Sequence, residues 1–496
     1  MNSLPVNASL DALYGTSLSL LTDLYQLTMA YGYWKQGMAE REAVFHLNFR
    51  KNPFQGGYAL TCGLESVLAY LERFSFSTED LDYLASLKGN DNAPLFETGF
   101  LEYLRTLRFT GSLDAVPDGS VIFPHEPLLR VTGPLLQGQL VETPLLNLIN
   151  FQTLIATKAS RVCLAAQGDM VLEFGLRRAQ GIDGSLSASL AAYVGGCDAT
   201  SNVLAGRLFG IPVRGTHAHA WVMAFEEELE AFEKYAEALP NNCIFLVDTY
   251  NTLEGVRRAV QVGKKLHAQG YKLAGIRLDS GDLAYLSIEA RKILDAAGFP
   301  ETAIVASNDL DEHLITDLKR QGARINVWGV GTQLVTAYDQ PALGGVYKLT
   351  ALKNPDQTWS YRIKLSEQAI KISNPGILQV RRFYRDGQAL CDAIYDVEQH
   401  PHEEWTLIDP LDMTRRRSLP MSMEQEDLLI PVMSAGRRTR PSVSITLSRA
   451  RAREQLALFH SGIQRLTHPH QYPVGLESSL FNLKTNLILQ ARGTTV

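Results

Sequence analysis

The sequence lacks the features of a membrane, secreted or disulfide-stabilised protein. No apolar run reaches the roughly 18 residues that a bilayer-spanning helix needs, and the opening residues Met1-Asn-Ser-Leu-Pro5 lack the basic stretch of a secretory signal. The five cysteines lie far apart without a Cys-x-x-Cys pair, which argues against a zinc knuckle or a disulfide framework. We therefore expect a cytoplasmic protein with reduced thiols and no membrane partner.

The sequence also lacks the charge of a nucleic-acid binder and the most familiar nucleotide-binding loops. Its formal net charge is -6, and the basic clusters at 415–417 and 437–440 are best interpreted as solvated faces. There is no Walker A sequence, no Gly-x-Gly-x-x-Gly opening a helix, and no Asp-Asp-x-x-x-Thr-Gly loop of the common phosphoribosyltransferases. These absences exclude several common routes to phosphate binding but leave others open.

The composition is that of a globular protein, and the chain is long enough to form several hydrophobic cores. The chain has 496 residues, of which 45% are hydrophobic and 20% charged, and its mean hydropathy is -0.07. This length predicts two or three domains. We expect an α+β N-terminal domain at 1–140, an α/β catalytic domain at 141–354, and a C-terminal segment at 355–496 that packs on both domains and whose strands complete the N-terminal sheet.

Short apolar runs alternate with helical patterns from about residue 170 onward, as in parallel βα units. Their spacing leaves room for one crossover helix each, which favours an α/β barrel or a doubly wound sheet. We identify seven runs: 170–174, 211–214, 243–247, 273–277, 303–306, 325–328 and 345–349.

Polar residues and glycines follow most of these runs. Because the carboxyl ends of parallel strands form the active-site face of such folds, the segments should converge on one site. The alternative is that they only form turns, since these residue types also favour turns and caps. The segments are 175–178, 215–219, Asp248-Thr249, 279–282, Ser307-Asn308 and 329–332.

The segment Gly215–Phe225 places two histidines between a short strand and a predicted amphipathic helix. Thr216 is the expected N-cap, which places His219 near the first turn. The amides and dipole at that end favour an anion attached to His219 or bound beside it. In the alternative interpretation, both histidines are ordinary polar residues that end a strand.

Two further strand ends carry residues suited to anions. Arg277 ends an apolar strand, where burial is costly unless the guanidinium meets a carboxylate or phosphate. Asp279 could meet ribose hydroxyls or hydrated Mg²⁺, while Asp282 could cap the following helix. Gly329-Val-Gly-Thr332 could bind phosphate through backbone amides and a hydroxyl, or could be a tight turn.

Taken together, these motifs resemble the nicotinate phosphoribosyltransferase family. The resemblance covers residues 20 to about 480, and its specificity comes from the combination of motifs. The matching segments are Leu21-Thr-Asp-Leu-Tyr-Gln-Leu-Thr-Met29, Phe174-Gly-Leu-Arg-Arg-Ala-Gln-Gly181, Gly215-Thr-His-Ala-His219, Arg277-Leu-Asp-Ser-Gly-Asp282, Gly329-Val-Gly-Thr332 and His468-Pro-His-Gln-Tyr-Pro-Val474.

The resemblance implies a type II phosphoribosyltransferase: an irregular α/β barrel with an α+β N-terminal domain completed by C-terminal strands. The implied enzyme is an ATP-coupled ligase of NAD salvage. It joins nicotinate to phosphoribosyl pyrophosphate, releases pyrophosphate, and hydrolyses ATP through a phosphohistidine at His219. His217 occupies a variable position of the family motif, and Ala220 stands where the family commonly has serine. Mg²⁺ and a homodimer with shared active sites are also implied.

Individual site roles follow from the same resemblance. Tyr25, from the neighbouring subunit, would stack on the pyridine ring, while Thr216 and Arg277 would hold the nicotinate carboxylate. Asp279 would act with His219 and Arg277 in catalysis and hold Mg²⁺. The remaining substrate-binding assignments are Arg178, Ser307, Gly329, Gly331 and Thr332, the last three for the 5-phosphate. With no cysteine after Cys391, we expect none of the zinc sites of some relatives.

Two alternatives remain at this stage. The chain could be a type II transferase for nicotinamide, which needs an acceptor carboxylate near the ring, or for quinolinate, which needs a more basic pocket. It could also be a catalytically silent regulatory or scaffold member of the fold, although the presence of His219, Arg277, Asp279 and Thr332 argues against that.

Overall fold

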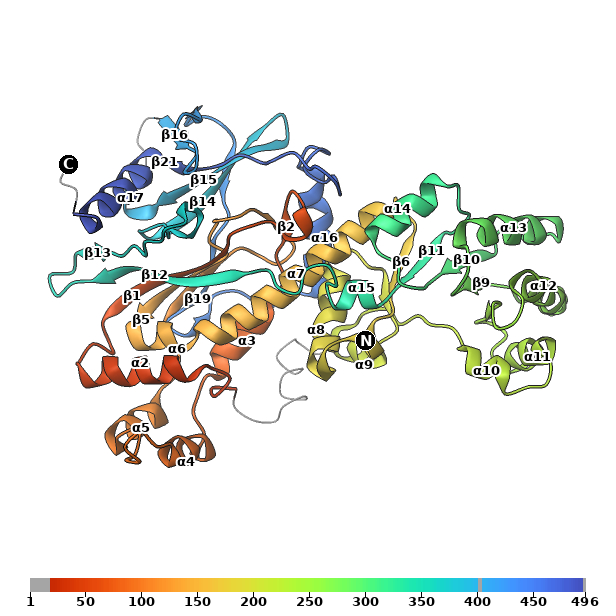
Figure 1. Ribbon diagram of the computed structural model, residues 1–496, viewed down its shortest axis with the longest axis horizontal. Coiled ribbons are helices and arrows are strands. Elements are labelled where there is room, and N and C mark those ends of the chain that lie inside the picture. Colours follow the sequence, from red (N-terminus) through yellow and green to blue (C-terminus); the bar gives the residue numbers. More distant parts are fainter. Residues whose placement is uncertain (1–17, 400–403, 494–496) are drawn as a thin grey trace. The chain divides into compact units, whose positions relative to one another are not determined.

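In a computed structural model of the chain, the described residues are 18–399 and 404–493, so the opening residues Met1–Pro5 lie outside them. These residues divide into two compact units (Figure 1). One contains residues 155–341 and the other 18–154 with 342–493, and α7 (Glu142–Ala166) contributes to both. No helix in the described ranges is long and apolar enough to cross a bilayer.

The 155–341 unit is built on a six-stranded sheet in the order β7-β6-β11-β10-β9-β8. Every neighbouring pair in it is parallel. Its strands are short and mostly buried, as expected for a parallel sheet covered on both faces. They are β6 (Met170–Glu173), β7 (Ala199–Thr200), β8 (Ile244–Leu246), β9 (Gly275–Leu278), β10 (Ala303–Ala306) and β11 (Val327–Val330).

Helices connect these strands, and four of them begin at a residue whose side chain caps the helix. Asp282 accepts a hydrogen bond from the Tyr285 amide at 3.0 Å, which confirms its predicted capping role. Asn251 and Asp311 cap the two neighbouring helices in the same way. The helical elements are η2 (Leu176–Arg178), α8 (Gly181–Val194), α9 (Val203–Phe209), α10 (His219–Met223), α11 (Glu228–Ala238), α12 (Thr252–Ala268), α13 (Leu283–Ala296), α14 (Glu312–Arg320) and α15 (Thr332–Val335).

Two of the seven predicted strands are wrong as members of this sheet. Residues 211–214 form only an isolated parallel bridge, Thr200 to Val213, because Pro212 has no amide hydrogen to extend a ladder. Residues 345–349 begin β12 (Gly345–Lys353), which pairs antiparallel with β1 (Glu42–Phe49) in the other unit. The two-residue strand β7 was not predicted, since it is too short to show a periodicity.

The second unit joins N-terminal and C-terminal strands in one antiparallel sheet, as predicted. Its order is β13-β12-β1-β5-β3-β19-β20, so segments more than 290 residues apart along the chain pair directly, for example Val44 with Ala351. The remaining strands of this sheet are β3 (Ser112–Ala115), β5 (Leu129–Pro134), β13 (Trp359–Tyr361), β19 (Ile430–Ser434) and β20 (Arg437–Arg438).

A further six-stranded sheet in this unit has the order β17-β16-β21-β15-β14-β18. Only its β15–β21 pair is parallel, and Phe383, Trp405 and Leu419 pack in its core. The strands are β14 (Leu378–Arg385), β15 (Gln388–Asp396), β16 (Glu404–Ile408), β17 (Arg416–Pro420), β18 (Gln425–Asp427) and β21 (Val474–Glu477), and β2 (Ala59–Leu60) pairs separately with β4 (Val121–Ile122).

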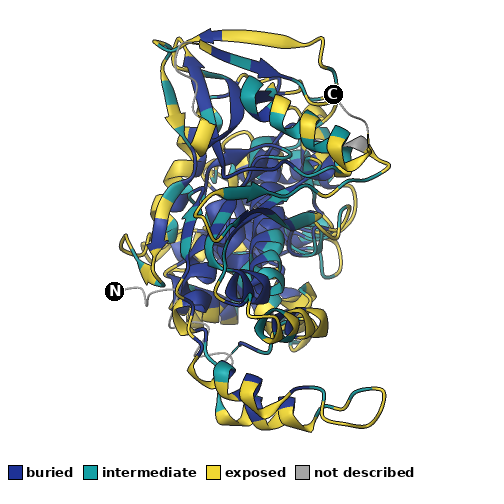
Figure 2. Cartoon of the chain, turned by 90° about the vertical axis from the view of Figure 1, so that its left-hand side faces the viewer, coloured by how far each residue is buried: buried dark blue, intermediate teal, exposed yellow. Residues whose placement is uncertain are grey.

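Buried residues gather along the strands of this unit, while many residues of its helices and loops are exposed (Figure 2). This pattern is typical of sheets that supply a core and helices that cover it. The helical elements are α2 (Leu24–Lys35), η1 (Pro53–Gln55), α3 (Leu64–Arg73), α4 (Thr78–Ser86), α5 (Thr98–Thr106), α6 (Leu135–Leu140), η3 (Ala369–Lys371), η4 (Val397–Gln399), α16 (Ile445–Ala457) and α17 (Ser478–Ala491).

Candidate active site

The carboxyl ends of β8, β9 and β10 bring several predicted site residues into one hydrogen-bonded cluster. Arg277 on β9 lies at its centre. Its Nη1 donates to Thr216 Oγ1 at 3.1 Å, its Nε to Ser307 Oγ at 2.9 Å, and its Nη2 to Asp279 Oδ1 at 2.9 Å. The guanidinium therefore has the partners that its burial requires, with 12% of its side chain exposed.

Asp279 is held in its ionised form by this cluster. Burial by itself would raise the pKa of Asp279, but a hydrogen bond from Ser307 and the positive charge of Arg277 outweigh it and lower the pKa. Ser307 is buried, and its hydroxyl is engaged by both charged residues. Ser307 thus positions Arg277 and Asp279, while Asp279 remains 30% exposed.

His219 is the first residue of α10, with its side chain 39% exposed. Its Nδ1 lies 3.2 Å from Thr249 Oγ1. Its Nε2 lies 3.7 Å from Asp279 Oδ2 and 3.9 Å from Asp248 Oδ1. The structure therefore places one imidazole nitrogen against a hydroxyl and the other beside two carboxylates.

The predicted N-cap at Thr216 is wrong, because Ala218 occupies that position. The predicted single helix is also interrupted, since α10 ends at Met223 and α11 begins at Glu228. Trp221 spans the break by donating from Nε1 to the Ala231 carbonyl at 3.0 Å. Trp221 therefore joins two short helices where a single amphipathic helix was predicted.

Asp248 belongs to the cluster, although we did not assign it a role from the sequence. Its side chain is 1% exposed, and its Oδ2 accepts from the Asp279 amide and from Ser280 Oγ, both at 2.7 Å. Its Oδ1 is buried without a hydrogen-bond partner in the described chain, which is costly for a carboxylate. The sequence feature that could have indicated a role for Asp248 was its position directly after a predicted strand.

His217 is structural. Its Nε2 accepts a hydrogen bond from the Leu246 amide at 3.2 Å, and its ring packs against Tyr235 with centroids 4.9 Å apart. Burial lowers the pKa of His217 to about 4. A neutral, buried imidazole in this position fixes the chain just before His219.

Two arginines lie on η2, which follows β6. Arg177 and Arg178 are exposed, and neither guanidinium has a hydrogen-bond or ion-pair partner within the described chain. Buried Glu173 supports this turn, since its carboxylate accepts from the Gly175 amide, from Ser189 Oγ at 2.8 Å and from Thr200 Oγ1 at 2.6 Å. Sequence reasoning did not assign Glu173, although a carboxylate at the end of an apolar strand was a signal.

The glycines of the 329–332 segment have different surroundings. Gly329 lies within β11, and a Cβ there would come within 2.7 Å of the Phe174 ring, so packing alone requires glycine. Gly331 precedes α15 as its N-cap, and Thr332 is the first residue of that helix. Gly331 and Thr332 are therefore the residues of this segment that lie at the carboxyl end of the strand.

Tyr25 lies in the other unit. It is on α2 and 48% exposed, close in sequence to three other exposed apolar side chains, Leu21, Leu24 and Met29. The cluster around Arg277 and the side chain of Tyr25 thus come from different units of the chain.

The parallel sheet and the charged residues at its carboxyl ends define an α/β enzyme that handles anionic substrates. Models of the nicotinate phosphoribosyltransferase (NAPRTase) N-terminal domain, family and C-terminal domain match residues 20–150, 170–362 and 378–484. The chain therefore belongs to the nicotinate phosphoribosyltransferase family.

Relatives with that name are similar over nearly their whole length. The protein from Bacillus subtilis (strain 168) is 44% identical over 481 residues, covering 96% of both chains. The protein from Mus musculus is 36% identical, covering 96% of this chain and 97% of its own. Both are named nicotinate phosphoribosyltransferase.

Solved structures of related proteins are also similar to this chain. A human nicotinic acid phosphoribosyltransferase is 34% identical with a TM-score of 0.83, covering 94% of this chain and 99% of its own. A nicotinate-nucleotide pyrophosphorylase from Pyrococcus furiosus, 20% identical with a TM-score of 0.68 and covering 89% of this chain and 95% of its own, shares the fold. The predicted fold class is confirmed.

Proposed function

We propose that the chain condenses nicotinate with phosphoribosyl pyrophosphate to give nicotinate mononucleotide and pyrophosphate, coupled to ATP hydrolysis through His219. The observation that carries the proposal is the Arg277 cluster beside His219, in a chain of the nicotinate phosphoribosyltransferase family. The pyridine nitrogen already has a lone pair, so the transfer requires charge stabilisation rather than a general base.

Nicotinate is the substrate that suits a cationic side chain with a neighbouring hydroxyl. Arg277 and Thr216 are already joined at 3.1 Å, and a carboxylate bound beside them would accept charge-assisted hydrogen bonds. Asp279 fixes the guanidinium from its other side. Nicotinamide would present no charge to Arg277, which favours the acid over the amide.

The phosphoryl acceptor that we propose is Nε2 of His219. In the tautomer with its proton on Nδ1, Nδ1–H donates a hydrogen bond to Thr249 Oγ1 and the lone pair lies on Nε2. That lone pair attacks the γ-phosphorus of ATP, the bond to the β–γ bridging oxygen breaks, and ADP leaves with the electron pair. Water later hydrolyses the phosphohistidine to phosphate.

Two carboxylates within 4 Å of Nε2 would repel an incoming phosphate unless a cation lay between them. The described chain offers no group of three or more His, Cys, Asp or Glu side chains for a metal. Mg²⁺ often binds through one or two carboxylates together with substrate phosphates, and the unpartnered Asp248 Oδ1 fits that arrangement. Asp248 and Asp279 would hold the ion, which supplies neutralisation of phosphate charge.

The phosphates of phosphoribosyl pyrophosphate are proposed to bind at the neighbouring strand ends. Gly331 and Thr332 would hold the 5-phosphate through their amides and the Thr332 hydroxyl. Packing already explains Gly329, which therefore has a supporting role. The Arg178 guanidinium has no partner among the described residues and would contact the substrate's phosphates.

A homodimer with shared active sites is part of the proposal. Leu21, Leu24, Tyr25 and Met29 are all at least 38% exposed on or beside α2, and neighbouring exposed apolar side chains are typical of an interface. Tyr25 would enter the neighbouring subunit's site and stack on the pyridine ring.

The deciding experiment compares nicotinate, nicotinamide and quinolinate as substrates with phosphoribosyl pyrophosphate, with and without ATP. We expect mononucleotide from nicotinate, stimulated by ATP, and phosphate on His219 detectable by mass spectrometry at neutral pH. Preference for either other pyridine would overturn the substrate, and no pyrophosphate release with any pyridine would indicate a silent member of the fold.

His219→Ala tests the coupling separately. We expect this variant to lose ATP stimulation and phosphohistidine while retaining weak ATP-independent transfer. His217→Gln is the matched control, since it changes the neighbouring buried imidazole, and it should keep ATP stimulation. Full stimulation in His219→Ala would contradict the assigned role.

A further inference from the structure

The unit formed by 18–154 and 342–493 contains a cavity of about 50 Å³ that opens to solvent. Its wall is formed by β15, β21 and α17 and by loops that follow β4, η3 and β16. Most of the wall is apolar, with contributions from Ile370, Ile372, Ile394, Leu411 and Leu476. An apolar wall with a few polar groups is typical of a small-molecule site.

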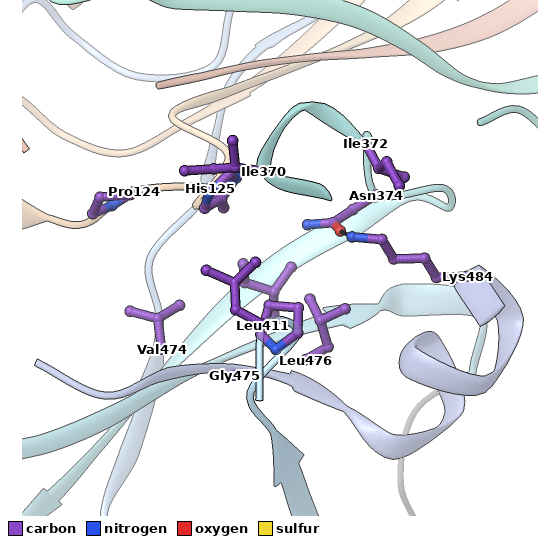
Figure 3. Close-up of a pocket in the computed structure, with 12 residues that line it drawn as sticks. Pro124, His125, Ile370, Ile372, Asn374, Leu411, Val474, Gly475, Leu476 and Lys484 are labelled. Atoms are coloured by element: carbon purple, nitrogen blue, oxygen red, sulfur yellow. Dashed lines mark hydrogen bonds between the residues drawn. The ribbon is translucent and has the colours of Figure 1, made fainter. Parts of the chain in front are cut away.

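One cationic side chain enters this apolar wall. Lys484 extends from α17, and its Nζ donates to Asn374 Oδ1 at 2.8 Å. Figure 3 shows this contact on one side of the cavity, with Pro124 and His125 on the other. No carboxylate lines the cavity, and Lys484 has no ion-pair partner within the described residues. A partly buried ammonium whose one partner among the described residues is an amide oxygen is incompletely stabilised.

The other polar groups leave Lys484 as the dominant charge in the wall. Burial lowers the pKa of His125 to about 4, so this imidazole is neutral near pH 7. Asn374 accepts from Lys484 through Oδ1, and its Nδ2 has no hydrogen-bond partner in the described chain. Lys484 Nζ and Asn374 Nδ2 are therefore two neighbouring donors in the wall. No described residue that lines the cavity offers them a negatively charged acceptor.

We propose that this cavity binds a small amphiphilic monocarboxylate. The carboxylate accepts from the Lys484 ammonium and the Asn374 amide, and the hydrocarbon part packs against the isoleucine and leucine side chains. A single cation matches a single negative charge, while the apolar remainder of the wall disfavours phosphates and dicarboxylates, whose additional charges would lack partners. This site is independent of the proposed transferase reaction.

Octanoate is a suitable probe, and binding is measured by titration calorimetry on the full chain. We expect one equivalent per chain, and affinity at least about tenfold weaker for octanamide and for Lys484→Met, since each removes the charge-assisted pair. Lys371→Met is the matched control. Lys371 lines the adjoining cleft with Arg50 and Lys348 but not this cavity, so octanoate affinity should stay unchanged.

A second measurement needs no variant. Burial lowers the pKa of Lys484 to about 8, and none of the other described residues that line this cavity is charged near neutral pH. The cations Arg50, Lys348 and Lys371 line the adjoining cleft. A bound carboxylate favours the protonated amine, so octanoate should slow reductive methylation of Lys484 by about tenfold at pH 8. Octanoate affinity should also fall as the pH rises above 8.

Several outcomes would overturn the proposal. These are unchanged octanoate affinity in Lys484→Met, equal loss in Lys371→Met, or octanamide binding as tightly as octanoate. Protection of Lys484 by pyrophosphate but not octanoate would indicate a phosphate site instead. If Lys484→Met does not fold, the reductive methylation of Lys484 in the unmodified chain tests the proposal instead. A methylation rate that octanoate does not slow would reject the site.

Discussion

Thr249 Oγ1 lies 3.2 Å from Nδ1 of His219, on the side of the ring opposite the two carboxylates. A hydroxyl that accepts a hydrogen bond from Nδ1–H favours the tautomer with its lone pair on Nε2. Thr249 is therefore proposed to position the histidine and to determine which nitrogen is phosphorylated.

Thr249→Val should slow phosphorylation of His219 by about five- to tenfold, since one hydrogen bond contributes about 1 kcal/mol to the favoured tautomer. Rapid-quench measurement of phosphohistidine formation from ATP checks this. Thr249→Ser retains the hydroxyl and should remain close to the unmodified protein. Equal rates in all three proteins would remove Thr249 from the mechanism.

Arg277→Ala should raise the KM for nicotinate by about ten- to a hundredfold, as expected for the loss of a charge-assisted pair of about 1.5–3 kcal/mol. Initial rates at saturating phosphoribosyl pyrophosphate provide the comparison. Arg277→Lys keeps the charge but not the three hydrogen bonds of the guanidinium. Its KM for nicotinate should therefore lie between those of the unmodified protein and Arg277→Ala. An unchanged KM for nicotinate in Arg277→Ala would count against the proposed carboxylate contact.

Glu173→Ala should lower the free energy of unfolding by at least about 2 kcal/mol, because the Gly175 amide and two buried hydroxyls lose their acceptor. It should also raise the KM for phosphoribosyl pyrophosphate, since the turn that carries Arg178 would loosen. Urea denaturation and steady-state kinetics measure the two effects. Ser189→Ala removes one donor only, and an equally large loss there would show that Glu173 is not the centre of the network.

Stability should depend on pH through His217. The pKa of this residue is about 4 in the folded chain and lies near 6.5 in the unfolded chain. The unfolded state therefore binds more protons between these values, and folding free energy is lost as the pH falls from 6.5 to 4.

The loss attributable to His217 is on the order of 3 kcal/mol over this interval. His217→Gln keeps an acceptor for the Leu246 amide but cannot titrate, so its unfolding free energy should fall less between pH 7 and pH 4. The comparison with the unmodified protein isolates this residue from His46 and His125, whose pKa values burial also lowers. Parallel pH profiles for the two proteins would contradict the assignment.

Local sequence patterns were sufficient for most strands of the parallel sheet, because each is an apolar run followed by a polar turn. The same pattern could not assign the run at 345–349, which pairs with β1 in another sheet. Hydrophobic periodicity reports burial and strand character, whereas the choice of partner depends on which edge is free in three dimensions.

The chemistry of His219, Arg277 and Asp279 was predictable from their motif, since each residue type suits phosphate or carboxylate binding at a strand end. Their mutual arrangement was not, because it depends on direct hydrogen bonds between residues as far as 61 positions apart along the chain. The Asp248 oxygen that is buried without a partner among the described residues, the Thr249 contact and the hydrogen bonds of Glu173 follow from the tertiary structure alone. Side chains acquire these roles only when folding removes water and leaves each polar atom with a specific partner, or with none.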